Sequence, residues 1–323
     1  MKLAILGAGR IAGIVSATLS KLDEITRYAV AARDLSRAEE FAKTYGYQKA
    51  YGSYEEMLSD PEVELVYVAT PHSHHFEHAM LCLQAGKHVL CEKAFTMNAN
   101  QARTLVEYAR EKGLYLAEAM WTRYMPSRTI INEAINSGII GPCRMLTANL
   151  SYLNYIHERI IRPELAGGAL LDLGVYGVNF ALMHFGDDIA KVDSSVVMTD
   201  TGVDASESIT LTYKDGRMAV LTHSVLGRSD RHGIFYGEKG YLVVDCINNP
   251  QRICAYDTAD ELLAEYAIPE KISGYEYEFL EAVRCIRAGK TESDSMPLDH
   301  TLRLMELMDE LRSQWGLVYP QEK

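Results

Sequence analysis

The sequence predicts an α/β protein in two parts, and three observations lead to this class. Short β-branched or aliphatic runs alternate with stretches of helical periodicity over residues 1–120, as in a doubly wound parallel sheet covered by helices on both faces. Over residues 121–323 strands separated by turn residues become prominent, which is typical of an α+β domain with a large, mostly antiparallel open sheet. The length of 323 residues suits two domains of roughly 150 residues each.

The first part is predicted to contain strands joined by helices. Strands are expected at residues 2–6, 28–32, 65–69, 88–91 and 115–119, and helices at 37–45, 76–85 and 99–112. Gly46, Gly86 and Gly113 each follow one of these helices, where a glycine commonly ends a helix. The helices are therefore predicted to be the crossover connections of a parallel sheet.

The second part is predicted to be built around hairpins. A helix at 127–136 and a strand at 144–152 precede an apolar stretch at 170–184 that is expected to form a buried helix. Strands follow between 192 and 256, and those at 208–213 and 217–226 flank the turn Lys214-Asp215-Gly216. Two helices, at 275–288 and 298–315, are predicted to close the chain.

Composition excludes several classes of protein. With 48% hydrophobic and 24% charged residues the chain has a globular composition, and a formal net charge of −12 disfavours nucleic acid and anionic lipid as partners. No continuous apolar run approaches the roughly 18 residues of a membrane span, and the N-terminus lacks the pattern of a signal peptide. Six cysteines without a C-x-x-C pair indicate free thiols, so a cytoplasmic location is predicted.

The first predicted strand runs directly into a glycine motif. Gly7, Gly9 and Ala12 form G-x-G-x-x-A where a strand gives way to a helix. The first glycine would make the tight turn, the second would let the backbone approach a pyrophosphate, and the helix N-terminus would donate amides to it. The sequence therefore predicts a Rossmann domain whose cofactor contacts include Gly7, Gly9, Arg10, Ile11 and Ala12.

The end of the second predicted strand bears on which dinucleotide binds. An Asp or Glu there would take the ribose hydroxyls of NAD, but this chain has Ala32 followed by Arg33. The small Ala32 leaves space and Arg33 supplies a guanidinium for the 2′-phosphate, so NADP is favoured over NAD. Arg37 is expected to assist. In the alternative interpretation Asp34 reaches the ribose and Arg33 is a solvated surface charge.

Four histidines lie close together after the strand predicted at 65–69. The chain reads Thr70-Pro71-His72-Ser73-His74-His75, with His78 one turn further on. Imidazoles at this spacing can bind a metal, but no acidic or thiol ligand lies nearby in the sequence. Packing of Pro71, His72 and His75 against the cofactor is favoured over a metal site or surface histidines, and no metal is predicted.

Two further segments complete a set of four motifs. Glu92-Lys93-Ala94 follows the strand predicted at 88–91, and residues 166–176 read Ala-Gly-Gly-Ala-Leu-Leu-Asp-Leu-Gly-Val-Tyr. With the glycine motif and the T-P-x-x-x-H pattern from Thr70 to His75, they resemble in order and spacing the motifs of the glucose-fructose oxidoreductase and inositol dehydrogenase family, Gfo/Idh/MocA. The stretch 119–124 and Tyr176 in place of His are most similar to the branch of dihydrodiol dehydrogenases and NADP-dependent D-xylose dehydrogenases.

The resemblance implies an NAD(P)-dependent oxidoreductase acting on a CH–OH or carbonyl carbon of a sugar-like or diol small molecule. Such chemistry needs a group that exchanges the hydroxyl proton, for which Tyr176 is expected, and a cation, for which Lys93 is expected, with Asp172 assisting. Further cofactor contacts are predicted at Thr70, Glu92, Lys93, Trp121 and Arg123, and further substrate contacts at Lys93, Trp121 and Tyr152. Without the motifs each residue has an ordinary interpretation. Tyr176 would be a packed aromatic side chain, Asp172 a helix cap or a member of an ion pair, and Lys93 a surface charge.

Ala94 departs from the family motif, which has proline after the lysine. The rigid φ of proline and its preference for a cis bond are lost, and a trans bond with an ordinary φ is expected instead. Lys93 is still expected to act as the motif implies.

Alternative functions keep the same fold. A non-catalytic dinucleotide-binding sensor would have no need for Lys93, Asp172 and Tyr176 together, which favours the enzyme. Other chemistries, such as an NAD-recycling glycosidase or an imine reductase, remain open.

The predicted sheet of the second part carries unusually few charges. Residues 218–226 contain no Lys, Arg, Asp or Glu, and residues 209–213 read Ile-Thr-Leu-Thr-Tyr. A sheet uncharged on both faces should be covered on both, so a homodimer packed sheet against sheet is predicted, as the resemblance also implies. In the alternative, a monomer covers that face with its two terminal helices.

Overall fold

The computed structural model describes all residues, Met1–Lys323, and its contacts divide them into two compact units. Unit 1 comprises Met1–Tyr124 and Lys271–Met305, and unit 2 comprises Met125–Glu270 and Glu306–Lys323. The predicted division at residue 120 assigned everything after it to one domain, whereas residues 271–305 lie with unit 1. Packing explains the difference, because Phe279 and its apolar neighbours on one helix are buried in the hydrophobic core of unit 1.

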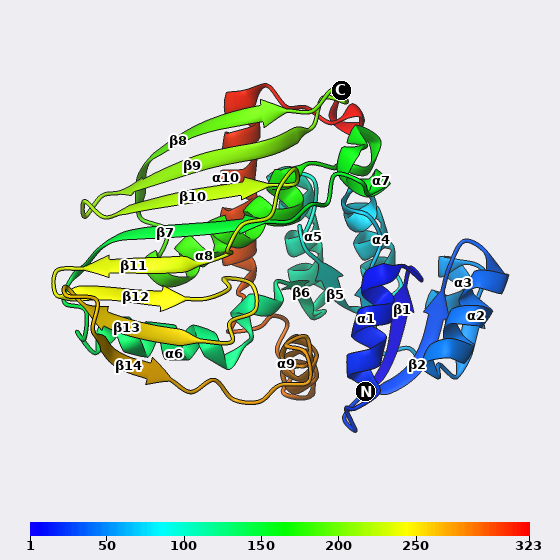
Figure 1. Cartoon of the computed structure of the whole chain (residues 1–323). Coiled ribbons are helices and arrows are strands. Elements are labelled where there is room, and N and C mark those ends of the chain that lie inside the picture. Colours follow the sequence, from blue (N-terminus) through cyan, green and yellow to red (C-terminus); the bar gives the residue numbers. More distant parts are fainter. The chain divides into compact units, whose positions relative to one another are not determined.

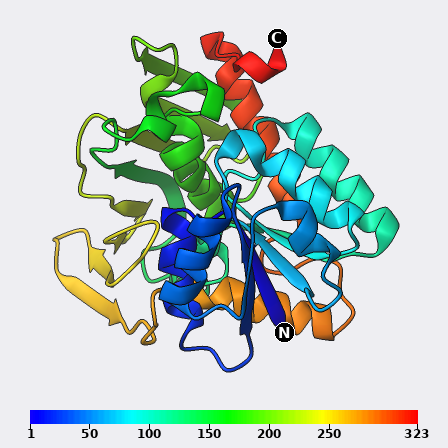
Figure 2. The ribbon, with the colours of Figure 1, turned by 90° about the vertical axis from the view of Figure 1, so that its right-hand side faces the viewer.

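Unit 1 is built on a parallel six-stranded sheet with helices of the same unit on both sides (Figures 1 and 2). The strand order β3-β2-β1-β4-β5-β6 is that of a Rossmann domain, as predicted. Its strands are β1 (Lys2–Leu6), β2 (Thr26–Ala31), β3 (Lys49–Tyr51), β4 (Leu65–Val68), β5 (His88–Glu92) and β6 (Leu116–Ala119). Its helices are α1 (Arg10–Leu19), α2 (Leu35–Tyr45), α3 (Tyr54–Ser59), α4 (His72–Gln84), α5 (Ala99–Lys112), the short η1 (Trp121–Arg123) and α9 (Glu276–Arg287).

The short elements of unit 1 are the ones that the sequence pattern did not predict. β3 has three residues and α3 has six, which is too few for a periodicity to emerge. Helix α4 begins at His72, four residues before its predicted start, because Pro71 precedes a first turn without apolar residues. Gly46 and Gly113 end α2 and α5 in the left-handed conformation, as predicted.

Unit 2 contains an eight-stranded sheet in the order β14-β13-β12-β11-β7-β10-β9-β8 (Figure 1). Every pair of neighbouring strands in this sheet is antiparallel except the parallel pair of β7 and β10. The predicted class of a mostly antiparallel sheet is therefore confirmed. Its strands are β7 (Cys143–Ser151), β8 (Ile189–Met198), β9 (Asp204–Tyr213), β10 (Met218–Ser224), β11 (Gly233–Gly237), β12 (Gly240–Val244), β13 (Ile253–Asp257) and β14 (Leu262–Tyr266). Its helical segments are α6 (Pro126–Asn136), α7 (Glu158–Ile161), η2 (Pro163–Leu165), η3 (Leu170–Gly174), α8 (Val175–Phe185) and η4 (Pro320–Glu322).

The buried helix predicted at 170–184 is two elements. Residues Leu170–Gly174 form one wide π-helical turn, η3, and the α-helix α8 follows without a break. Helix α8 packs on β7 and β10, and this side of the sheet is called the inner face here. Such π turns occur mostly as single insertions and often at functional sites, and the apolar pattern alone does not reveal them.

Helix α10 (Leu298–Trp315) belongs to both units, since the division falls between Met305 and Glu306. At its end Trp315 Nε1 donates to Ser194 Oγ at 2.8 Å. Ser194 pairs with the buried Ile209, so this contact lies on the inner face of the unit 2 sheet.

One segment, Pro163–Phe185, is long and apolar enough by composition to cross a membrane. Polar residues such as Glu164 and Asp172 interrupt it, so it is not the continuous apolar run that would have predicted a span from the sequence. Within its most apolar window 94% is buried inside the structure, so the segment forms part of the core.

Candidate functional site

The glycine motif lies where β1 passes into α1. Gly7 has φ +105°, and a Cβ there would lie only 3.0 Å from the carbonyl oxygen of Ala69, so an L side chain would be strained and crowded. At Gly9, the N-cap of α1, the nearest atom to a Cβ would be 3.9 Å away. The helix starts without a capping side chain and without an acidic residue in its first turn. Its first amides and the positive end of its dipole therefore suit an anion such as a pyrophosphate.

The two arginines expected at the 2′-phosphate differ in their contacts. Arg37 donates from Nε and Nη2 to the Ala8 carbonyl at 3.2 and 2.9 Å, so it supports the glycine loop itself. Arg33 is exposed and close enough to Tyr54 and His78 to influence their pKa values. Asp34 caps α2, with Oδ1 accepting from the Ser36 amide at 2.9 Å and the Ser36 hydroxyl at 2.8 Å, and these bonds lower its pKa.

The histidines after β4 are engaged in local contacts. His75 is buried, with Nε2 2.7 Å from the Thr70 carbonyl and Nδ1 2.8 Å from the Ala94 carbonyl, and so it links the loops that follow β4 and β5. Burial lowers the pKa of His75 to about 4. His78 Nδ1 lies 3.0 Å from Thr70 Oγ1, and the rings of His74 and His78 stack. No group of three or more His, Cys, Asp or Glu side chains is arranged to hold a metal ion.

The loop after β5 carries Glu92 and Lys93. Glu92 is buried; one of its carboxylate oxygens accepts from the Tyr67 hydroxyl and the other from the Lys93 amide at 3.1 Å. Lys93 is half-buried, and the Lys93–Ala94 peptide bond is cis, which differs from the trans bond expected without proline.

Trp121 and Arg123, both predicted to contact ligand, are buried in η1. Trp121 stacks on Tyr275 with ring centroids 4.2 Å apart and an angle of 11° between the planes. Arg123 Nη1 lies 3.1 Å from His300 Nδ1. Sequence reasoning missed Tyr275 and His300, because both belong to the segment 271–305 and no local pattern links them to η1.

In unit 2 the predicted residues lie on and around the π turn. Asp172 is buried within η3, and its Oδ1 accepts from Arg159 Nη1 at 2.9 Å. Its Oδ2 accepts from Asn154 Nδ2 at 3.4 Å, a contact that sequence reasoning missed. Tyr176 is buried at the start of α8. The carboxylate of Asp172 is thus fixed by an arginine and an amide about one helical turn before Tyr176.

Tyr152, the remaining predicted substrate contact, lies just after β7. Its side chain is half-buried, and the guanidinium of Arg231 lies 5.7 Å from the centre of its ring. Arg231 Nη1 is also 3.5 Å from the Tyr152 hydroxyl, which is at the limit of a hydrogen bond.

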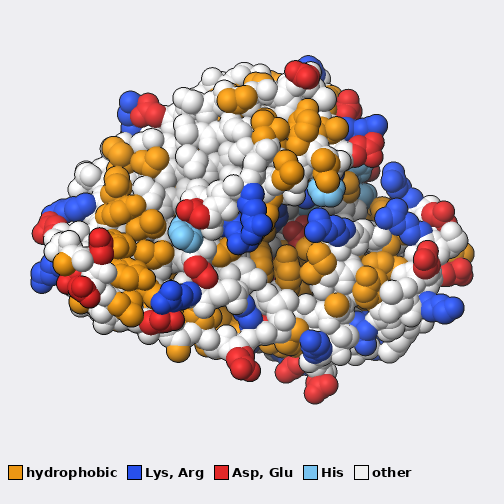
Figure 3. Space-filling model, viewed as in Figure 1, with side chains coloured by type: hydrophobic (Ala, Val, Ile, Leu, Met, Phe, Trp, Pro, Cys, Tyr) orange, Lys and Arg blue, Asp and Glu red, His pale blue; other side chains and the backbone are white.

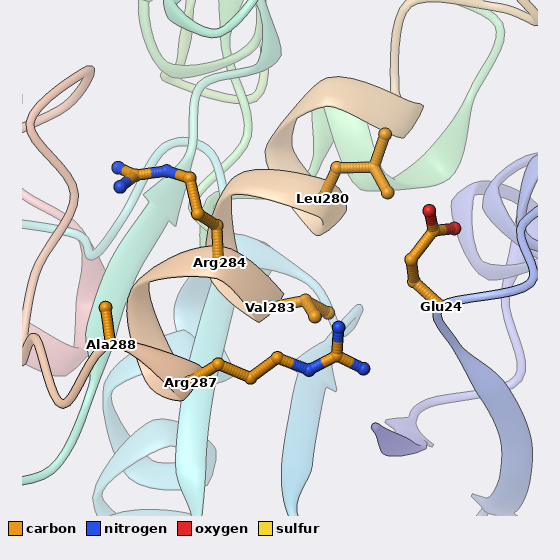
Figure 4. Close-up of a pocket in the computed structure, with 6 residues that line it drawn as sticks. All are labelled: Glu24, Leu280, Val283, Arg284, Arg287 and Ala288. Atoms are coloured by element: carbon orange, nitrogen blue, oxygen red, sulfur yellow. The ribbon is translucent and has the colours of Figure 1, made fainter.

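A surface hollow elsewhere in unit 1 contains none of the predicted site residues (Figure 4). It has a volume of about 470 Å³ and lies along α9 beside the loop before β2. Glu24, Leu280, Val283, Arg284, Arg287 and Ala288 line it. Arg284 is already paired with Glu281, so nothing here matches the predicted chemistry.

Comparison with known families identifies the class of protein. Residues 1–120 match the model of the GFO/IDH/MocA oxidoreductase family with its NAD-binding Rossmann fold, and residues 130–243 match the GFO/IDH/MocA C-terminal domain. The chain therefore belongs to the Gfo/Idh/MocA family of oxidoreductases, as the four motifs predicted.

Relatives along the whole chain are dehydrogenases. A trans-1,2-dihydrobenzene-1,2-diol dehydrogenase of Mus musculus is 37% identical over 333 residues, covering 99% of this chain and 98% of that protein. The human enzyme of the same name is 36% identical, with 99% and 98% covered.

Solved structures share the fold across nearly the whole chain. KijD10, a 3-ketoreductase from Actinomadura kijaniata in complex with TDP-benzene and NADP, has a TM-score of 0.86 at 25% identity, with 97% of each chain covered. An aldose-aldose oxidoreductase from Caulobacter crescentus complexed with glycerol has a TM-score of 0.87 at 19% identity, with 98% of each chain covered.

Proposed function

We propose that this chain is an NADP-dependent oxidoreductase that acts on a carbinol or carbonyl carbon of a diol or sugar-like small molecule. The observation that carries the proposal is the bare N-terminus of α1 behind Gly7 and Gly9, which suits a pyrophosphate, in a chain whose full-length relatives are diol dehydrogenases. The NADP complex of the 3-ketoreductase from Actinomadura kijaniata supports the choice of cofactor.

Arg33 is assigned to the 2′-phosphate. It is the exposed guanidinium beside the end of β2, whereas Arg37 is bonded to the Ala8 carbonyl and Asp34 is bonded to Ser36. The two Ser36 bonds hold the Asp34 side chain as the cap of α2, which makes the NAD interpretation less favourable. Gly7, Gly9, Arg10, Ile11 and Ala12 are assigned to the pyrophosphate side, and Thr70, Pro71, His72, His75, Glu92, Trp121 and Arg123 to the rest of the cofactor site.

In the proposed chemistry three side chains handle the substrate proton and the negative charge on the substrate oxygen. The bound cofactor supplies or accepts the hydride. The Tyr176 hydroxyl donates a proton to the substrate oxygen during reduction and takes it back during oxidation. The Lys93 ammonium stabilises negative charge on that oxygen, and Asp172, itself held by Arg159, orients the substrate hydroxyl. Tyr152 and Trp121 are assigned to the walls of the substrate site.

A turnover assay tests this function. The protein is mixed with NADPH or NADP and panels of diols, α-dicarbonyls and sugars, and absorbance of the reduced nicotinamide is followed. Turnover with at least one panel member is expected. Tight binding of NADPH without turnover of any member would contradict the enzyme and favour the non-catalytic sensor.

We further propose a homodimer that packs through the outer face of the unit 2 sheet, opposite α8. One cross-strand row of this face runs along six neighbouring strands and is apolar or aromatic throughout: Met218, Met145, Tyr236, Tyr241, Tyr256 and Leu262. Hydrophobic side chains form a band over these strands (Figure 3). The end of α10 contacts the inner face instead, so the chain's own terminal helix leaves this row uncovered.

Light scattering behind a sizing column tests the dimer. A mass near twice 36.2 kDa is expected for the unchanged protein. Val220→Lys places a charge on the outer face, so the mass of this variant should fall to that of one chain. A mass near 36.2 kDa for the unchanged protein at micromolar concentration would contradict the dimer.

We also propose a cytoplasmic location with no nucleic acid or membrane partner. The six cysteines are all unpaired, which supports a reducing compartment. The net charge of −12 supports the absence of a polyanionic partner. Fractionation of cells that express the full chain would test the location, and recovery with membranes would contradict it.

A further inference from the structure

Three titratable side chains are buried beneath the segment that carries Asp172 and Tyr176. Asp204 begins β9, and Glu207 and His223 face each other as a cross-strand pair on β9 and β10. The side chains of Glu207 and His223 are fully buried, with His223 Nδ1 3.1 Å from Glu207 Oε1. Despite this short distance, no polar side-chain atom of Glu207 or His223 makes a hydrogen bond of good geometry, and neither does Asp204 Oδ1. These three residues are called the buried cluster below.

Each member of the buried cluster lies against the backbone of residues 168–177 at a glycine. A Cβ added at Gly168 would collide with the Asp204 carboxylate, one at Gly174 with the Glu207 carboxylate, and one at Gly177 with the His223 ring. Three glycines thus leave room for three polar side chains.

The buried cluster also supplies a hydrogen bond to the π turn. Asp204 Oδ2 accepts from the Leu170 amide at 2.5 Å, at the residue where η3 begins. Neither η3 nor α8 has a capping side chain at its start, so this carboxylate takes the place of a cap. The buried Tyr319 hydroxyl also donates to the carbonyl of Gly167, the residue before Gly168, at 2.8 Å.

Burial keeps the cluster uncharged at neutral pH. It raises the pKa of Asp204 and of Glu207 to about 8, the charge of Glu207 adding to the shift of Asp204, and it lowers the pKa of His223 to about 3. In these forms Glu207 carries a proton that can be donated to His223 Nδ1. Apolar side chains would fill the same space at lower cost in desolvation, so polarity here calls for a reason beyond stability.

We propose that Asp204, Glu207 and His223 are positioning residues that hold η3 and the start of α8 in the geometry in which Asp172 and Tyr176 act. The proposal rests on the proposed function, because it assigns the cluster to those two side chains. The cluster does not touch substrate; it acts through the backbone at Gly168, Leu170, Gly174 and Gly177.

The test separates positioning from stability with Glu207→Leu and Glu207→Gln. Leucine removes the carboxyl group at similar volume but leaves the buried His223 ring facing an apolar side chain, so a modest fall in the midpoint of unfolding is expected while the protein stays folded. Displacement of Asp172 and Tyr176 should nevertheless lower kcat about ten- to a hundredfold. Glutamine can still hydrogen-bond to His223 and should restore most of kcat. The dissociation constant for NADPH, which reports on unit 1, should change less than about twofold in both variants.

Controls make each outcome decisive. Glu270→Leu, an exposed position of the same unit, should leave kcat unchanged. A folded Glu207→Leu with kcat within about twofold of the parent would overturn the proposal. If Glu207→Leu does not fold, His223→Leu is judged by the same criteria, and failure of both to fold would assign the cluster to stability alone and overturn the proposal. Tyr176→Phe in the same assay tests the proposed function separately, since full activity of that variant would refute the acid-base role whatever the cluster does.

Discussion

Gly9 at the start of α1 in unit 1 and Gly168, Gly174 and Gly177 in unit 2 differ in what lies next to their Cα atoms. Beside Gly9 an added Cβ would fit, since its nearest neighbour would be the Ala69 carbonyl oxygen at 3.9 Å, an ordinary contact distance. Beside Gly168, Gly174 and Gly177 that space holds the carboxyl group of Asp204, the carboxyl group of Glu207 and the imidazole of His223. A glycine can therefore mark a place kept for a ligand or a place already occupied by the fold, and the residue type alone does not distinguish them.

The comparison predicts opposite consequences for alanine in the two units. Gly168→Ala combines φ +114° with a collision against Asp204, so the free energy of unfolding should fall by about 3 to 5 kcal/mol. Gly9→Ala should change it by less than about 0.5 kcal/mol and should instead weaken NADPH binding, because the methyl group occupies the place proposed for the pyrophosphate. Urea unfolding and calorimetry measure the two effects.

Gly86→Ala is the matched control for backbone strain. It has φ +73° with nothing within 4 Å of an added Cβ, so about 1 to 2 kcal/mol is expected from the conformation alone. Equal destabilisation by Gly168→Ala and Gly86→Ala would mean that Asp204 does not fill the space beside Gly168.

Arg33 tests whether the exposed side of the unit 1 site selects the cofactor. An arginine-phosphate contact stabilises binding by about 1.5 to 3 kcal/mol, so NADP should bind about ten- to 150-fold more tightly than NAD. Arg33→Ala should remove that difference and leave NAD binding unchanged, as measured by calorimetry. Equal dissociation constants for the two cofactors in the unchanged protein would contradict the assignment.

The buried cluster should appear in the pH dependence of stability. The pKa of Glu207 is raised to about 8 in the folded chain, so the folded state keeps a proton that the unfolded state releases above about pH 4.5. Each such proton makes the free energy of unfolding fall by about 1.4 kcal/mol per pH unit between those values. Glu207→Gln should make the decline from pH 5.5 to 7.5 shallower by about that slope.

His223 has the opposite sign and a different window. Its pKa is lowered to about 3, so its contribution is present above about pH 6.5 and is lost as the pH falls toward 3. Measurements between pH 6.5 and 7.5 therefore isolate the carboxyl groups. If the free energy of unfolding, measured with urea, changes with pH equally in the parent and in Glu207→Gln over this range, the raised pKa of Glu207 is refuted. Glu270→Gln, at an exposed position, serves as the control.

Sequence reasoning succeeded where chemistry is local in the chain. The strands at 2–6 and 65–69, the glycine motif and the family motifs are contiguous runs whose periodicity or spacing is visible without a structure. The family and the class of both sheets were predicted from them and are confirmed.

What sequence reasoning missed depends on residues far apart in the chain. The packing of residues 271–305 into unit 1, which brings Tyr275 onto Trp121, leaves no local signal. Glu207 and His223 are adjacent only through the register of β9 and β10. The π turn at 170–174 differs from an α-helix only in that its hydrogen bonds span five residues instead of four, which a mostly apolar stretch does not reveal.

Tyr176→Phe tests most directly the proposal that Tyr176 exchanges the substrate proton in an NADP-dependent oxidoreductase. The substitution keeps the buried ring and removes only the hydroxyl, so kcat should fall by about 10² to 10⁴, equivalent to about 3 to 5 kcal/mol, while the dissociation constant for NADPH stays the same. A folded Tyr176→Phe protein with kcat within a few-fold of the parent would contradict the claim and would show that the ring only packs.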